Sequence, residues 1–580
     1  MWGGIGLHHL LAVGQSAEEW SVVDYKPPTV PIFGWLREYQ KPWLVRDVIA
    51  GFTVWGLIVP EGMAYASLAG LPPQAGLYTV LVSLIAYAVF GTSRHLVVAG
   101  TSATAALVGS TIGALKPADA VVYAKLAAAL VLLVGLLFLL AGLAKLGFVA
   151  QFLSRPVMEG FVFGLALFVA VGQLNKLFGV SKGHGNTFQK LWHVISELGS
   201  ANWWAFAIGA VALVALFVLP RLSKRLPVGL VVLIAAIAVS GAMDLAGRHG
   251  VEVVGKLPKG LPSIALPHVG LSALWTLIPA AAGIVLVAYS EALGVAESFA
   301  ARHGYEIDPN QELVSFGVAN LASGLLGGLV ACGGMSSTAV NDGGGAKTQV
   351  SGLTAAAAAV ITVIALTPLF KSLPEAVLAA LIIHAVSHMM SVAKLKAVYR
   401  LSKVEFWLGI TALVGVVALD VLQGLLIAMG ASLLLVVYKS SRPAVTVLGE
   451  APDRRGTFVA VDRNPGAITR HGVLMLRLDA PLYYANASSN REVFKQSVLL
   501  AVPAVRAVIF NPEVQHTLDV TSYEMVSELI GWMQARGIEV FVTHVHKDLL
   551  SQSEMNGLIE LIGADHIVSD IPAALMRIDG

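Results

Sequence analysis

The 580-residue sequence predicts a polytopic α-helical membrane protein that ends in a smaller soluble α/β domain. Hydrophobic residues make up 56% of the chain and charged residues only 13%, a composition that water alone would not keep dispersed. Apolar runs of membrane-spanning length recur from about residue 48 to residue 438, and each must satisfy its own backbone hydrogen bonds inside hydrocarbon. After residue 438 these runs stop, and charge and proline appear in "KSSRPAVTVLGEAPDRRG".

The first 46 residues are predicted to form a cytoplasmic region rather than a cleaved signal peptide. Their opening, "MWGGIGLHHLLAVGQSAEEW", contains no Lys or Arg and has acidic residues at its end. A signal peptide would need a basic start followed by an unbroken apolar stretch. The formal net charge of +2, without a basic block interleaved with aromatics, argues against nucleic acid as a partner.

Fourteen apolar segments place the predicted transmembrane domain at residues 47–438. The expected ranges are 48–69, 74–90, 101–115, 120–143, 156–173, 203–220, 227–243, 274–298, 312–330, 336–345, 350–367, 374–391, 405–420 and 422–438. The basic residues of the short loops fall on one side, which the positive-inside rule assigns to the cytoplasm; they are Arg94, Arg155, Arg221, Lys224, Arg225, Arg302, Lys347, Lys394, Lys396, Arg400 and Lys403. An even number of segments then places both termini in the cytoplasm, with the protein in the cell membrane.

Residues 439–580 are predicted to fold as a separate α/β domain. Short strand-like runs, "VLMLRL", "VRAVIF" and "IEVFVTH", are separated by amphipathic helical stretches such as "SYEMVSELIGWMQARG". This alternation is typical of a layered α/β structure.

The third and tenth segments share an unusual pattern, visible in "VVAGTSATAALVG" and "ACGGMSSTAVNDGGG". In each, apolar residues lead through glycine into a Ser/Thr cluster and then a short helix. Because the two lie seven segments apart in a chain of fourteen, the two halves would run in opposite directions, as in an inverted repeat. Both helices are shorter than the ~30 Å hydrocarbon thickness. We therefore expect both to begin near mid-membrane, with their N-termini facing each other.

Two facing helix N-termini would make an anion-binding site. Each carries unpaired backbone N–H groups and about half a positive charge. Glycines allow close approach, and hydroxyl groups can cap the helices or bind the oxygens of an anion. The alternative is that small residues only allow tight helix packing. The candidate substrate-binding residues here are Thr101, Ser102, Ala103, Ser336, Ser337 and Thr338.

Two acids stand in apolar surroundings on the companion first and eighth segments. These are Glu61 in "IVPEGMAYAS" and Glu291 in "LVAYSEALGVAES". A carboxylate at membrane depth costs several kcal/mol, and a nearby anion favours its protonation further. We therefore expect Glu61 and Glu291 to take up protons when an anion binds. Tyr65, one turn after Glu61, could donate a hydrogen bond to the anion. Pro60 and Gly62 are expected to loosen the helix around Glu61.

No enzyme, metal or cofactor is predicted. Cys332 is the single cysteine and cannot form an internal disulfide, and no Cys/His cluster is recognised anywhere in the sequence, so no metal site is expected. Nucleophile motifs and phosphate-binding loops are also not recognised.

The same residues resemble the sulfate permease (SulP) family of anion transporters. The similarity begins in "PEGMAYASLAGLPPQAGLYTVLVSLIAYAVFGTSRHLVVAG" and continues through "ESFAARHGYEIDPNQELVSFGVANLASG" and "SSTAVNDGGGAKTQVSG". It ends in "RLDAPLYYANASSNREVF", which is similar to the STAS domain of that family. The resemblance implies a seven-plus-seven inverted repeat with core and gate bundles, elevator-type motion and a homodimer. It also implies that Glu61 and Tyr65 line the anion site, and that an acid at the position of Glu61 or Glu291 couples transport to protons.

One position departs from the family pattern, and this departure leaves the identity of the transported anion open. Many relatives carry arginine where this chain has Ser337, so a fixed positive charge is missing. Sulfate remains the leading candidate, while a monoanion such as bicarbonate or a protonated C4-dicarboxylate gains weight. Coupling to sodium has weak support, because Val295 rather than a hydroxyl residue follows Glu291 by one turn. A passive anion channel and a membrane-anchored regulator remain alternatives.

The C-terminal domain contains a candidate regulatory loop in "VIFNPEVQHTLDVTSYEM". It resembles the loop that carries a phosphorylatable Ser or Thr after an aspartate in bacterial signalling relatives. Asp519, Thr521 and Ser522 occupy these positions. The alternative is that these residues only cap the following helix.

Overall fold

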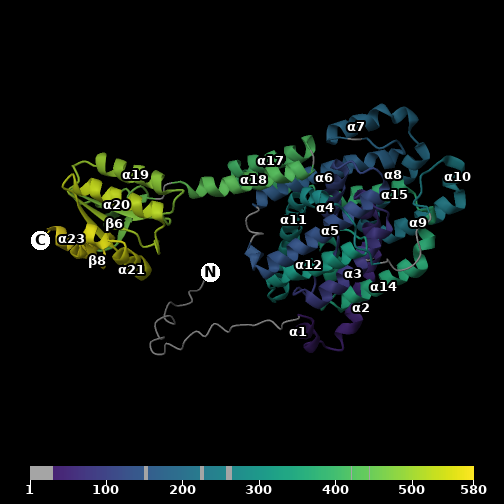
Figure 1. Ribbon diagram of the computed structural model, residues 1–580, viewed down its shortest axis with the longest axis horizontal. Helices are drawn as coiled ribbons and strands as arrows, with labels where there is room; N and C mark the ends of the chain where they lie inside the picture. The colour runs from purple at the N-terminus through teal and green to yellow at the C-terminus, as the bar shows by residue number, and fades with distance from the viewer. Residues whose placement is uncertain are drawn as a thin grey trace, which may run out of the picture. The chain divides into compact units, whose positions relative to one another are not determined.

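The computed structural model describes residues 31–148, 154–183, 185–222, 228–255, 264–419, 421–442 and 445–579 (Figure 1). Most of the predicted N-terminal region, together with Lys224 and Arg225 of the predicted cytoplasmic loops, lies outside these residues. The chain divides into two compact units, Met1–Ser432 and Leu433–Gly580, which are described separately below. The predicted domain boundary at residue 438 lies inside helix α18, Val421–Ser440.

Each of the fourteen predicted segments corresponds to a helix. The first seven are α2 Trp43–Leu68, α3 Gln74–Phe90, α4 Ser102–Ala114, α5 Ala120–Leu143, α6 Arg155–Phe178, α8 Trp203–Leu222 and α9 Val228–Met243. The second seven are α11 Leu271–His303, α12 Pro309–Leu325, α13 Met335–Gly343, α14 Val350–Ile361, α15 Glu375–Ser387, α17 Lys403–Ala418 and α18. Among the described residues, eight helical spans are long and apolar enough to cross a membrane.

Several boundaries differ from the prediction because capping residues were overlooked. Helix α12 begins at Pro309 rather than 312, since the Asp308 side chain accepts hydrogen bonds from the backbone N–H groups of Asn310 and Gln311. Helix α11 continues to His303 rather than 298 and ends at Gly304, whose φ of 69° suits glycine. Counting apolar residues alone does not detect these signals.

Among the described residues of the first unit, four α-helices lie outside the fourteen predicted segments. Three occupy connecting segments and one precedes α2, and the longest of the four have ten residues each. Polar side chains cap three of them: Asn186 caps α7, Asp244 caps α10 and Ser391 caps α16. These helices are α1 Ile32–Arg37, α7 Thr187–Ser196, α10 Leu245–His249 and α16 Val392–Leu401.

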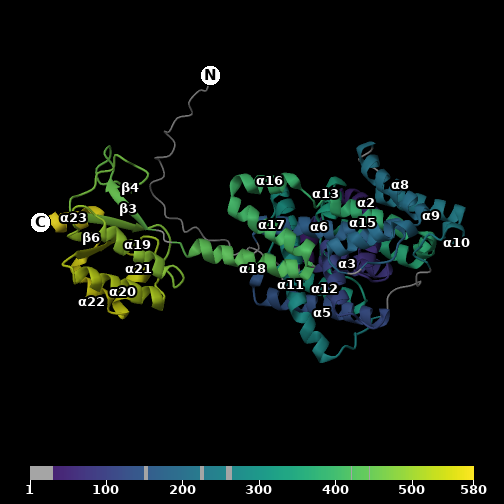
Figure 2. The same cartoon turned by 90° about the horizontal axis from the view of Figure 1, so that it is seen from above.

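The two halves of the repeat interleave to form two bundles. Helix α12 packs against α3 and α5 (Figures 1 and 2), and α14 packs against α2 and α3 (Figure 1). In the same way α15 packs against α6 and α8, and α17 against α6. We call α2–α5 with α11–α14 the core bundle, and α6, α8, α9, α15, α17 and α18 the gate bundle. This arrangement confirms the predicted inverted repeat.

The C-terminal unit is an α/β domain built on a six-stranded sheet, as predicted. Its strand order is β4-β3-β5-β6-β7-β8, in which β5 to β8 are parallel and β3 is antiparallel to both neighbours. The strands are β3 Val445–Glu450, β4 Phe458–Ala460, β5 Val473–Leu478, β6 Ala507–Asn511, β7 Glu539–Thr543 and β8 Ile567–Val568. Strand β5 coincides with the predicted "VLMLRL".

Helices cover both faces of this sheet. Alternate strand residues such as Leu476 and Val508 pack with α19 to α22, whereas Met475 and Ile509 pack with α23. Both faces are therefore apolar, which explains the nearly continuous hydrophobic runs of the parallel strands. The helices are α19 Ala487–Leu499, α20 Val520–Gln534, α21 Lys547–Met555, α22 Leu558–Ile562 and α23 Ile571–Asp579.

Candidate functional site

The two half-helices are joined by a short pair of antiparallel strands. Strand β1, Val98–Gly100, leads into α4, and strand β2, Ala331–Gly333, leads into α13. Val98 pairs with Gly333 and Gly100 with Ala331. Because the strands run in opposite directions, the two helices leave the pair in opposite directions while their N-termini stay close together. The inverted relation between the third and tenth segments is thus visible in the backbone.

The N-terminus of α4 is closed by a reciprocal capping box. The Thr101 hydroxyl accepts a hydrogen bond from the Thr104 backbone N–H, and the Thr104 hydroxyl lies 3.2 Å from the backbone nitrogen of Thr101. The Thr104 hydroxyl also lies 3.2 Å from the carbonyl oxygen of Val330, the residue just before β2. One side chain therefore holds the start of α4 against the strand that leads into α13.

The hydroxyl groups of α13 have different environments. Ser337 is buried, and its hydroxyl donates to the Gly334 carbonyl oxygen. The buried Thr338 hydroxyl accepts a hydrogen bond from the Val97 backbone N–H at 3.1 Å, which ties α13 to the segment before β1. Ser336, by contrast, is exposed.

The two helix starts approach each other at Gly334. A methyl group placed there would lie 2.7 Å from the Ser337 hydroxyl oxygen, too close for a side chain, and 3.9 Å from the Thr101 methyl carbon. Thr101 and Ser337 therefore border the same point, where only glycine lets the backbone come this close. Ser102 and Ala103, in the first turn of α4, are also buried.

Both acids lie in helices of the core bundle. Glu61 in α2 and Glu291 in α11 are partly buried, and the buried Tyr65 interacts electrostatically with both. Pro60 and Gly62 lie inside α2, which runs from Trp43 to Leu68, and the expected loosening around Glu61 stays a prediction. Gly62 packs closely against α3, since a methyl group there would lie 3.3 Å from the Gly76 carbonyl oxygen.

Two residues that the sequence did not predict as binding residues lie beside the candidate site residues. Cys332 in β2 is buried, with its sulfur 3.2 Å from the Ala288 carbonyl oxygen and 4.0 Å from a carboxylate oxygen of Glu291. Met389 follows α15 of the gate bundle, and the Ser102 hydroxyl donates to its sulfur at 3.2 Å. Nothing in the sequence indicates that the Met389 thioether or the Cys332 thiol lies at a binding site. Only the tertiary structure shows where these two side chains are.

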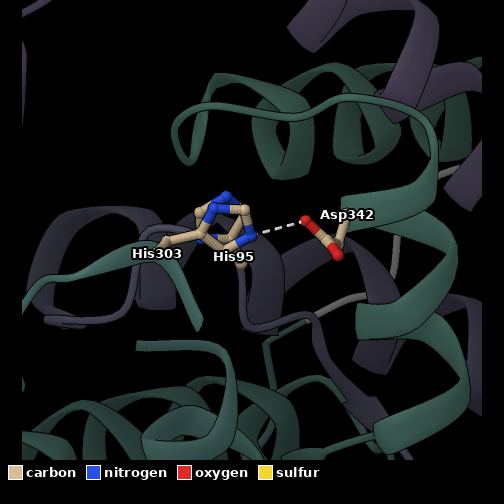
Figure 3. Close-up of side chains that lie close together, drawn as sticks. All are labelled: His95, His303 and Asp342. Atoms are coloured by element: carbon tan, nitrogen blue, oxygen red, sulfur yellow. Dashed lines mark hydrogen bonds and ion pairs between the residues drawn. The ribbon is translucent and has the colours of Figure 1, made fainter. Parts of the chain in front are cut away.

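The connecting segments beside the half-helices bring together two histidines and an aspartate (Figure 3). His95 precedes β1, His303 ends α11 and Asp342 lies near the end of α13. The two imidazole rings stack with centroids 4.2 Å apart, and His303 Nε2 lies 2.7 Å from Asp342 Oδ1. Burial, and next the neighbouring His303, lower the pKa of His95 to about 4. His95 is therefore a neutral imidazole at neutral pH.

In the C-terminal domain, Asp519 caps α20. Its carboxylate accepts hydrogen bonds from the backbone N–H groups of Ser522 and Tyr484, at 2.8 and 2.6 Å. Burial acts to raise the pKa of Asp519, but these hydrogen bonds outweigh it and hold the pKa below its usual value. Thr521 is exposed, whereas Ser522 is fully buried. The capping role is present in the structure, and Thr521 offers the accessible hydroxyl.

An inverted repeat with broken helices that meet at their N-termini is the architecture of a membrane transporter. The chain belongs to the sulfate permease family, whose model matches residues 44–412. It is 34% identical to a probable sulfate transporter of Mycobacterium tuberculosis, covering 94% of this chain and 99% of that protein. It is also 31% identical to the chloroplastic sulfate transporter 4.1 of Arabidopsis thaliana, covering 94% and 82% respectively.

Solved structures share the fold. The murine Slc26a9 anion transporter in its inward-facing state superposes with a TM-score of 0.87 at 23% identity, covering 95% of this chain and 94% of that one. The transmembrane domain of the cyanobacterial bicarbonate transporter BicA gives a TM-score of 0.60, also at 23% identity, covering 68% of this chain and 98% of that one. This family is one of transporters, so the protein is not an enzyme.

Proposed function

We propose that this anion transporter carries sulfate across the cell membrane together with protons, by an elevator-type displacement of the core bundle against the gate bundle. The observation that carries the proposal is the meeting of the α4 and α13 N-termini across β1 and β2, with Thr101 and Ser337 both close to Gly334. The relatives named as sulfate transporters support the choice of anion.

In this proposal the two helix ends attract the anion and the two acids compensate its charge. Backbone N–H groups at the starts of α4 and α13 face the ligand, with Thr101, Ser102 and Ser337 at the rim. Proton uptake by Glu61 or Glu291 removes the repulsion between carboxylate and anion. The complex that crosses the membrane is then closer to neutral, which lowers the cost of moving it through a region of low dielectric constant.

Uptake of labelled sulfate into proteoliposomes tests the coupling. An inward proton gradient should accelerate uptake by the unaltered protein. We expect Glu61→Gln and Glu291→Gln to abolish the response to the gradient while sulfate exchange across the membrane persists, because glutamine keeps the side-chain shape and cannot take up the coupled proton. A gradient without effect on the unaltered protein would refute proton coupling.

Glu297→Gln is the matched control for this experiment. Glu297 lies on α11, the helix that carries Glu291, but its side chain is exposed. The substitution makes the same chemical change outside the proposed site. Its uptake should respond to the gradient as the unaltered protein does, and a lost response would point to a general effect of charge on α11.

Ser337 favours a second candidate substrate, an anion with a single charge such as bicarbonate or a protonated dicarboxylate. Many relatives have arginine at this position, and a neutral hydroxyl contributes less to binding a dianion than a guanidinium group does. Competition against labelled sulfate by bicarbonate, succinate and chloride distinguishes the two. Stronger competition by a monoanion than by unlabelled sulfate would favour the second candidate.

We further propose that both termini lie in the cytoplasm and that the protein acts as a homodimer in the lipid membrane. The basic residues of the short loops support this orientation. The exposed Thr521 beside Asp519 supports a regulatory site in the C-terminal domain, with Thr521 rather than the buried Ser522 as the accessible hydroxyl.

A further inference from the structure

We propose that His95, His303 and Asp342 bind a first-row transition-metal dication, with Zn²⁺ as the best fit. The three side chains come from segments far apart in the sequence and meet beside the ends of α11 and α13 (Figure 3). One ligand atom from each lies within 4.8 Å of the others. The proposal does not depend on the anion or on proton coupling.

The donor set selects the kind of metal. Two imidazole nitrogens and one carboxylate oxygen suit Zn²⁺, Co²⁺ or Ni²⁺, whereas Ca²⁺ and Mg²⁺ prefer oxygen ligands alone. Arg302 pairs with Asp342 Oδ2 at 2.7 Å and offsets its charge. Electrostatic attraction alone would therefore contribute little to the free energy of binding a cation here. The binding free energy must come from the nitrogen ligands.

Neighbouring groups already orient two of the ligands. His95 Nε2 lies 3.2 Å from the Ala346 carbonyl oxygen, and because a carbonyl only accepts, Nε2 carries the hydrogen and Nδ1 presents a lone pair. Arg302 holds one oxygen of Asp342 and leaves Oδ1 for a metal. Metal-binding histidines usually donate their second ring N–H to a group such as a carbonyl oxygen, and metal-binding carboxylates usually accept a hydrogen bond. His95 and Asp342 both have such contacts.

Two contacts must change when the metal binds. The His95 and His303 rings are nearly parallel, with 14° between their planes, yet a metal must lie in the plane of each ring. His303 has to turn out of the stack, and it can do so because its side chain is 28% exposed while His95 is buried. The Tyr305 hydroxyl, 3.1 Å from His95 Nδ1, must also move aside. The metal then replaces the contact between His303 Nε2 and Asp342 Oδ1.

Zinc titration of the purified full-length protein tests this site. The protein is prepared without a polyhistidine tag, treated with chelator, and titrated with Zn²⁺ against a fluorescent zinc indicator. We expect one ion per chain. His303→Ala and Asp342→Asn should each weaken binding at least about tenfold, since the first removes an imidazole nitrogen and the second replaces the carboxylate by a weakly ligating neutral amide. Co²⁺ should give visible absorption bands of a site with nitrogen and oxygen ligands, and these should disappear in His303→Ala.

His471→Ala is the matched control, because His471 is an exposed histidine of the C-terminal domain outside the cluster. It should bind one Zn²⁺ with unchanged affinity. Equal binding by His303→Ala and the unaltered protein, or no ion bound by the unaltered protein, would overturn the proposal. A thermal melt of each metal-free variant separates lost binding from lost folding, because Asp342→Asn also removes the ion pair with Arg302.

Discussion

At the scale of single residues, Thr104 connects the two half-helices. Its hydroxyl completes the capping box of α4 and reaches the Val330 carbonyl oxygen before β2, and the side chain is fully buried. Thr111, two turns later on the same helix, is also buried, but its hydroxyl has no hydrogen-bond partner among the described residues. The two threonines therefore separate the effect of hydrogen bonding from that of side-chain shape.

Thr104→Val should destabilise the protein and weaken anion binding. Valine keeps the shape of threonine but loses the capping hydroxyl, which costs about 1 kcal/mol for a cap or a buried hydrogen bond. A thermal melt in detergent, with and without sulfate, measures both effects. Thr111→Val should leave the melting temperature within error of the unaltered protein; a larger loss in Thr111→Val than in Thr104→Val would contradict the assigned role of Thr104.

At the scale of helices, α2 and α3 touch backbone to backbone beside one of the two acids. A methyl group at Gly76 would lie 1.8 Å from the Gly62 carbonyl oxygen, a distance at which atoms overlap. Gly62 directly follows Glu61. Because Gly62 and Gly76 have no side chains, α3 packs directly against the segment of α2 that carries Glu61.

Gly76→Ala should lower the melting temperature, because α2 and α3 would have to move apart and overpacking typically costs about 1–3 kcal/mol. Gly113→Ala is the control, since a methyl group at Gly113 in α4 meets no atom within 4 Å. It makes the same chemical change and should leave stability unchanged or slightly improved. Equal melting temperatures for the two variants would show that the α2–α3 contact adapts.

At the scale of the whole molecule, the chain consists of two units with separate hydrophobic cores. The transmembrane unit contains the paired half-helices and both acids, while the C-terminal domain buries its own apolar residues on the two faces of one sheet. Transport and folding of the C-terminal domain should therefore be separable, unlike in a regulator whose only working part is that domain.

A protein truncated after Ser440 should retain measurable sulfate uptake in proteoliposomes. A fragment of residues 441–580 should unfold in one cooperative transition, followed by circular dichroism. Complete loss of uptake in the truncated protein, with its thermal melt preserved, would favour the regulator over the transporter. A fragment without a cooperative transition would show that the domain depends on the rest of the chain.

Much of this fold could be predicted because a segment that crosses hydrocarbon must satisfy its backbone hydrogen bonds internally, as an α-helix does. Each apolar run had to become a helix, and the shared Gly and Ser/Thr pattern predicted that α4 and α13 would be related. The connecting helices, such as α7 and α16, were missed because they carry no long apolar run. Asp308 also shifted the start of α12, because a capping side chain outweighs the position of the first apolar residue.

The sequence by itself determined the class of protein and the repeat, and it predicted two acids near a pair of half-helices, since these follow from composition, spacing and the cost of burying charge. Tertiary structure alone decided that Cys332 touches Glu291, that Met389 of the gate side meets Ser102, and that His95, His303 and Asp342 converge. The physical reason is that such contacts join separate segments of the chain, 41 residues apart for Glu291 and Cys332 and 287 for Ser102 and Met389. The local pattern of apolar and polar residues does not specify distances between side chains that depend on how the helices pack against one another.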